Sequence, residues 1–97
     1  MRHPKHVAGD AAEALAALEF IEQGAWVFTT AQSNSPADMV VVRPGGQVDL
    51  LDIKKLGKRI NKHGRNPTKI HRVLTPQQRI CGVRICYVDL STREVDV

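Results

Sequence analysis

Three ionisable residues are spaced so that a single β-hairpin could bring them together, namely Asp38, Asp52 and Lys54. Asp38 begins one apolar predicted strand and Lys54 ends the next, with the turn residues 44–47 (Pro-Gly-Gly-Gln) between them. Side chains alternate between the two faces of a strand, so Asp52 and Lys54 should project from the same face. In the register that this turn predicts, Asp38 opposes roughly Ile53. Two carboxylates and one ammonium group are therefore expected to converge at one end of the hairpin.

Such a group of side chains suits a divalent metal. Two carboxylates this close repel each other, and apolar strands make each costly to ionise unless a cation is present. Mg²⁺ takes hard oxygen ligands and usually keeps one or two protein carboxylates together with water and phosphate. We expect Asp38, Asp52 and the backbone carbonyl of Ile53 to bind it, and Lys54 to orient the activated water or stabilise developing charge. An acid-x-Lys pair alone is usually a solvated strand edge, so the prediction depends on the whole hairpin.

Positive charge is concentrated in the second half of the chain. Ten of the fourteen Lys and Arg residues lie between Lys54 and Arg84, and no Asp or Glu occurs from Ile53 to Val88. This segregation is typical of a surface that meets a polyanion and favours nucleic acid as the partner. A solubilising loop without a partner is the alternative. The cations expected to contact phosphates are Lys55, Lys58, Arg59, Lys62, Arg65 and Lys69.

A helix is predicted from Asp10 to Gln23. Asp10 is a suitable N-cap, Glu13 stands where a capping box has its acid, and Gly24 supplies a left-handed stop. Helical spacing gives one apolar stripe of Ala11, Leu15, Leu18 and Ile21 or Glu22.

The remaining elements are expected to be short strands around a long basic loop. Asn66-Pro67 interrupts that loop, and Thr75-Pro76 begins a short helix as N-cap and first residue. Residues 1–9 are expected to form a loose arm. The predicted strands are 25–31, 38–43, 48–54, 82–90 and 94–97, and the basic loop is 55–74.

With these elements in place, the sequence resembles the PD-(D/E)XK nuclease superfamily, especially small phage and archaeal endonucleases related to Holliday-junction resolvases. The matching segments, over about residues 9–97, are Glu13 in the first helix, Ser35-Pro36-Ala37-Asp38, Asp52-Ile53-Lys54, and the closing segments 74–78 and 82–89. An Ala separates Pro36 from Asp38, and the second acid is Asp rather than the commoner Glu. These departures bear on metal preference and rate.

The resemblance implies an α/β, restriction-endonuclease-like fold with a central mixed five-stranded sheet flanked by helices. It also implies Mg²⁺ or Mn²⁺ dependence, hydrolysis of DNA phosphodiester bonds by an endonuclease, and a homodimer. Glu13 would then help to hold metal or water, although capping explains its position equally well. Three alternatives stay open: a resolvase that selects branched junctions, a non-catalytic nucleic-acid-binding module with the same fold, and a subunit that needs a partner protein for specificity.

Length and composition limit the number of domains and the class of protein that the chain can form. The chain has 97 residues, 42% of them hydrophobic and 25% charged, with a net charge of +4, which predicts one globular domain over residues 1–97. No apolar run is long enough to cross a bilayer, and no signal sequence is evident at the N-terminus. Cys81 and Cys86 are expected to be ordinary reduced thiols. These features predict a cytoplasmic protein, in the host cytoplasm if it is phage-encoded.

Overall fold

The computed structural model describes residues 3–32, 34–56, 58–59, 68–69 and 73–97, and for 58–59 and 68–69 it describes the backbone only. Two helices and seven strands are present in this part of the chain. In chain order the elements are α1 (Pro4–Glu22), β1 (Trp26–Thr29), β2 (Met39–Val42), β3 (Val48–Lys55), β4 (Lys58–Arg59), β5 (Thr68–Lys69), α2 (Pro76–Cys81), β6 (Arg84–Asp89) and β7 (Glu94–Asp96). Neither helix is long and apolar enough to span a membrane, within the ranges given above.

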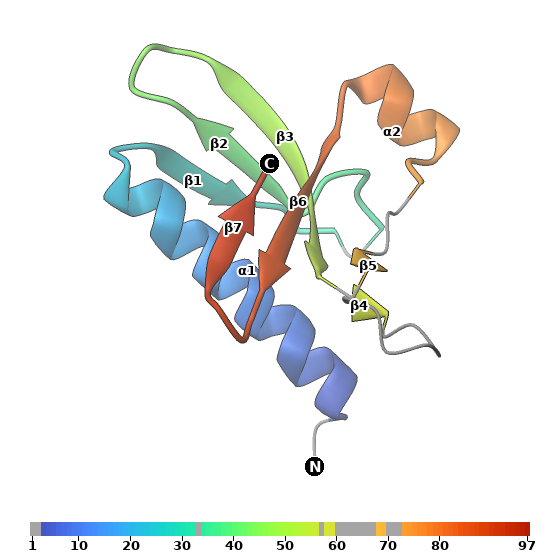
Figure 1. The fold of residues 1–97 in the computed structure, drawn as a ribbon. Coiled ribbons are helices and arrows are strands. Elements are labelled where there is room, and N and C mark those ends of the chain that lie inside the picture. The colour runs from blue at the N-terminus through green and yellow to red at the C-terminus, as the bar shows by residue number, and fades with distance from the viewer. Residues whose placement is uncertain (1–2, 33, 57, 60–67, 70–72) are drawn as a thin grey trace.

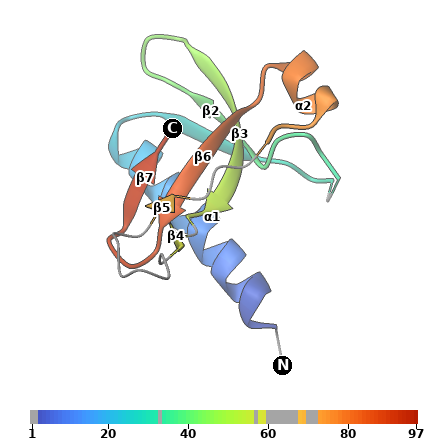
Figure 2. The same ribbon diagram turned by 45° about the vertical axis from the view of Figure 1, so that its right-hand side comes forward.

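Five strands form one mixed sheet in the order β1-β2-β3-β6-β7. The pair β3 and β6 is parallel, and the other three pairs are antiparallel. Helix α1 lies along one face of the sheet, while α2 precedes β6 at the end of the sheet remote from β4 (Figure 1, Figure 2). The α/β architecture with a mixed five-stranded sheet is therefore confirmed, and β2 lies inside the sheet as its uniformly apolar sequence predicts.

Helix α1 begins at Pro4 rather than at Asp10. His3 is the N-cap, its Nδ1 accepts a hydrogen bond of 3.1 Å from the backbone N–H of Lys5, and Pro4 occupies the first helical position. Asp10 is thus not the cap, and residues 4–9 belong to the helix instead of a loose arm. The predicted end is confirmed, because Gly24 has φ of 87° and follows the last turn.

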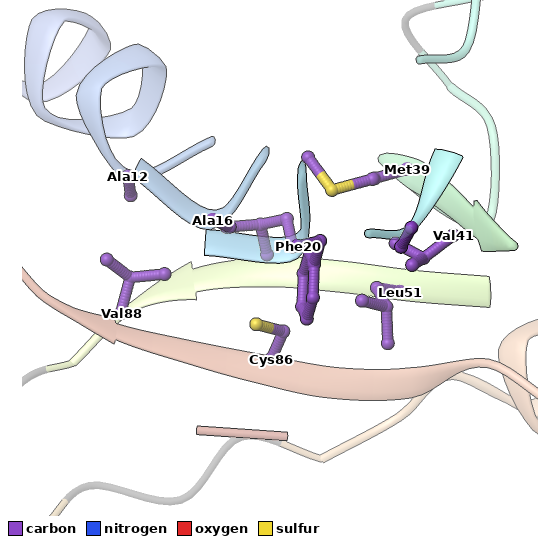
Figure 3. Close-up of a cluster of buried hydrophobic side chains, with 10 residues drawn as sticks. Ala12, Ala16, Phe20, Met39, Val41, Leu51, Cys86 and Val88 are labelled. Atoms are coloured by element: carbon purple, nitrogen blue, oxygen red, sulfur yellow. The ribbon is translucent and has the colours of Figure 1, made fainter. Parts of the chain in front are cut away.

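The core lies between α1 and the sheet (Figure 3). Phe20 is its largest fully buried side chain and packs with the sheet residues, while Ala12 and Ala16 let the helix approach closely. The stripe that helical spacing gives is not the buried face of α1, since Leu18 and Ile21 are 50% and 56% exposed. Apolar side chains occur around most of α1, so helical spacing alone does not select the buried face. The sheet residues of the core are Met39, Val41, Leu51, Ile53, Cys86 and Val88.

The segment predicted as one long basic loop contains two short strands. β4 and β5 pair antiparallel, with Lys58 opposite Lys69 and Arg59 opposite Thr68. They lie beyond the end of β3 (Figure 1). Strands of two residues leave no periodicity in a sequence, so only their pairing reveals them.

Candidate active site

The hairpin of β2 and β3 brings Asp38 beside Asp52. Met39 pairs with Leu51, and Asp38 directly precedes Met39, so Asp38 lies beside Leu51 and Asp52, about one residue away from the predicted position opposite Ile53. The turn explains the difference, because Arg43 N–H donates to the carbonyl of Gln47 at 2.8 Å and only residues 44–46 form the loop. A three-residue loop with a positive φ at its last residue is a common hairpin connection.

Backbone hydrogen bonds fix Asp38 at the start of β2. Its N–H donates to the carbonyl of Leu51 at 2.8 Å, and its Oδ2 accepts from the N–H of Ile53 at 2.7 Å. Groups two residues apart on a strand point toward the same neighbour. The carbonyl of Ile53, predicted as a metal ligand, therefore points toward the side on which Asp38 lies.

Asp52 lies on the sheet face away from the core. It is 8% exposed, and its neighbours Leu51 and Ile53 point to the opposite face, against α1. The Nζ of Lys54 lies 3.5 Å from Asp52 Oδ1, which agrees with the prediction that both side chains project from one face. The other carboxylate oxygen of Asp52 accepts a hydrogen bond of 3.0 Å from Gln78 Nε2.

The Asp52 carboxylate influences the ionisation of Asp38. Burial, the strongest effect, raises the pKa of Asp38; the Asp52 carboxylate raises it further, while the N–H of Ile53 and the charge of Lys54 oppose the rise. Burial also raises the pKa of Glu13, and the charges of Asp38 and Asp10 add to this. The negative charge of Asp38 on the sheet therefore acts on the carboxyl group of Glu13 in α1. A cation bound at the carboxylate pair would favour the ionised form of Asp38 and so oppose the rise in its pKa.

Gln78 also belongs to the site, although the sequence around Thr75-Pro76 predicts only a short helix there. Its side-chain Oε1 accepts a hydrogen bond of 2.9 Å from the backbone N–H of Thr75, and its backbone N–H donates to Thr75 Oγ1. These two hydrogen bonds form the capping box of α2. Its Nε2 donates to Asp52 and also to the carbonyl of Pro36 at 3.0 Å. The sequence Thr-Pro-Gln-Gln predicts the cap, but the long-range contact with Asp52 leaves no local signal.

The available oxygens fit a metal that needs few protein ligands. In the described ranges, no three His, Cys, Asp or Glu side chains lie close enough to hold a metal ion, so Glu13 does not complete a cluster with Asp38 and Asp52. Mg²⁺ commonly uses only one or two carboxylates and fills its other positions with water and substrate oxygens. A carboxylate pair with one backbone carbonyl meets that requirement.

The predicted phosphate contacts can be placed only in part. Lys55 is exposed at the end of β3. The backbones of Lys58, Arg59 and Lys69 lie in β4 and β5. Lys62 and Arg65 lie outside the described residues.

No protein-family model and no curated protein matches the sequence. The solved structure of a bacterial homing endonuclease, I-Ssp6803I, does match, with a TM-score of 0.67 and 19% sequence identity. The match covers 98% of this chain and 64% of that chain, so this chain spans less than two thirds of the length of that endonuclease. The likeness shows the fold: this is an α/β protein with the mixed sheet and helix arrangement of that structure.

Proposed function

We propose that this chain is a metal-dependent DNA endonuclease with a PD-(D/E)XK-type site. The observation that carries the proposal is the direct interaction of the Asp38 and Asp52 carboxyl groups at the open end of one hairpin, with Lys54 Nζ 3.5 Å from Asp52. A fold shared with a homing endonuclease and the basic second half of the chain support DNA as the substrate.

The proposal gives each residue of the site a role. Asp38, Asp52 and the Ile53 carbonyl would hold Mg²⁺ or Mn²⁺, which supplies a water of lowered pKa and a charge that stabilises the reacting phosphate. Lys54 lies beside Asp52 and donates to the attacking water or to the developing negative charge. Gln78 holds the Asp52 carboxylate in one orientation. Glu13 raises the negative potential around Asp38 and stays a predicted water-positioning group.

The test is nicking of supercoiled plasmid in EDTA, Mg²⁺ or Mn²⁺. Asp38→Asn and Asp52→Asn are the informative variants, because each keeps a hydrogen-bond acceptor for Ile53 N–H or Gln78 while removing the charge. We expect each of them, and Lys54→Met, to lower the metal-dependent rate by about 10²-fold or more. Glu94→Gln on β7 removes an exposed acid as the matched control. Calorimetric titration with Mg²⁺ should show weaker binding by both Asp variants.

Two outcomes would redirect the proposal. Tight DNA binding without cutting in either metal would identify a non-catalytic binding module, or a subunit that needs a partner protein. Faster cutting of a four-way junction than of linear duplex would favour the resolvase alternative, and equal rates would reject it.

A further inference from the structure

A cleft of about 600 Å³ opens between the first turns of α1 and the end of β3. Lys5 and Gly9 line it from the helix, and Ile53, Lys54 and Lys55 line it from the strand. Ile53 and Lys54 directly follow Asp52 in β3, so the cleft lies next to the candidate active site, although neither Asp38 nor Asp52 is among its lining residues in the described part of the chain. Lys5 and Lys55 are both exposed.

The cleft is positively charged. Three lysines line it, and no Asp or Glu is among its lining residues in the described part of the chain. Lys5 also stands in the first turn of α1, which contains no acid. A cation there opposes the positive end of the helix dipole, where an anion is normally stabilising. A bound anion would offset both the lysine charges and the helix terminus.

We propose that this cleft binds a backbone phosphate of the DNA strand, next to the phosphodiester that reaches Asp38 and Asp52. The ligands are Lys5 and Lys55, which act as mobile point charges toward phosphate oxygens. The inference rests on the proposed function and adds Lys5 and the first turn of α1 to the DNA-contacting surface. Substrate thus crosses the N-terminal end of α1 as well as the end of β3.

Salt-dependent binding tests the cleft without metal or cleavage. The affinity for a labelled DNA duplex is measured by fluorescence anisotropy in EDTA over a series of KCl concentrations. Each ion pair with a B-DNA phosphate contributes about 0.9 to the slope of log K against log salt. Lys5→Gln and Lys55→Gln should each reduce the slope by about that amount and lower the affinity several-fold at low salt. Arg93→Gln, in the turn between β6 and β7 and outside the cleft, removes the same charge as the matched control.

Gly9 provides an independent pair of variants. A Cβ added at Gly9 meets no atom within 4 Å, so a longer side chain can enter the cleft without displacing the fold. Gly9→Glu and Gly9→Gln add nearly the same volume and differ in charge. Gly9→Glu should weaken DNA binding beyond Gly9→Gln, and the difference should shrink as salt rises.

The outcomes separate this inference from the proposed function. Lysine variants with the slope and affinity of Arg93→Gln, or Gly9→Glu that binds as well as Gly9→Gln, would overturn the cleft assignment even if the wild type cuts DNA. A wild type that does not bind the duplex would also overturn it. Conversely, reduced slopes in the lysine variants with no metal-dependent nicking by the wild type would keep the phosphate cleft and replace the self-sufficient nuclease with a non-catalytic module or a subunit that needs a partner protein.

Discussion

At the residue scale, Gln78 joins the parts of the site that come from different elements. Its side chain links the cap of α2, the Pro36 carbonyl before β2 and the Asp52 carboxylate on β3. Gln78→Glu keeps an acceptor for Thr75 N–H but replaces the donor to Asp52 with a second negative charge. Loss of such an outer partner typically lowers metal affinity or activity about 10- to 100-fold.

We expect that loss for Gln78→Glu in metal-dependent nicking, together with a rise in the pH at which activity sets in, because the new carboxylate adds negative charge beside the carboxylate pair. Gln77→Glu adds the same charge on an exposed position of α2 and should retain activity. Equal pH–rate profiles for the two variants would exclude a positioning role for Gln78.

Asp49 is a buried acid that differs from Asp38. Cations stabilise its charge, whereas Asp38 lies beside another carboxylate. Burial opposes its ionisation, but hydrogen bonds from Arg43 and Gln47 and the charges of Arg43 and Arg84 outweigh burial and lower its pKa. The Arg43 Nε atom lies 2.9 Å from Asp49 Oδ2. Asp49→Asn should therefore reduce the free energy of unfolding by about 1–3 kcal/mol at pH 7.

The cost of Asp49→Asn should depend on pH with a definite sign. A carboxyl whose folded pKa lies below its unfolded value of about 3.9 stabilises the fold fully above that pH, and the contribution disappears as pH falls through the folded pKa. Urea unfolding at pH 7 and at pH 3 should show the difference between wild type and variant becoming smaller at pH 3. A difference that stays constant would mean that packing, not charge, holds Asp49; Glu94→Gln is the exposed control.

At the scale of elements, substitutions at two glycines test where α1 runs and where it ends. Gly9 is inside the helix, and a Cβ there would meet open space, whereas Gly24 follows the helix with φ of 87°. Gly9→Ala should stabilise the protein by about 0.5–1 kcal/mol, because glycine loses more backbone freedom on folding. Gly24→Ala should destabilise it by about 1–2 kcal/mol through the left-handed conformation. Thermal unfolding should move the midpoints of these variants in opposite directions, and a stabilising Gly24→Ala would contradict the cap.

Local chemistry predicts the hairpin and most strand positions well. The apolar run before Arg43, the Pro-Gly-Gly turn and the alternation after Val48 indicate β2 and β3 with errors of one residue. That one residue changes the partner of Asp38, because a turn of three or four residues cannot be distinguished from composition. The parallel pairing of β3 with β6 and the contact of Gln78 with Asp52 depend on residues far apart in sequence. The convergence of Asp38, Asp52 and Lys54 was predictable because all three lie on one local hairpin.

At the scale of the whole molecule, α1 has a second apolar side that the fold leaves exposed. The side chains recur with spacings of four, three, four and three residues, which is the pattern of a helix that packs against another helix. They point away from the core face of Ala12, Ala16 and Phe20. The exposed residues of this stripe are Val7, Ala11, Ala14, Leu18 and Ile21.

The homodimer that the family resemblance implies stays a prediction, and this stripe supplies a direct test of it. A twofold axis brings identical patches together, and an apolar stripe is complementary to itself. We expect sedimentation equilibrium to show a dimer for the wild type and a monomer for Leu18→Glu, because a carboxylate buried without a partner is strongly unfavourable. Ile80→Glu on α2, at a position 87% exposed, should leave the dimer intact. Dissociation by Phe28→Glu instead of Leu18→Glu would move the contact to the exposed face of β1, and a monomeric wild type would reject the homodimer.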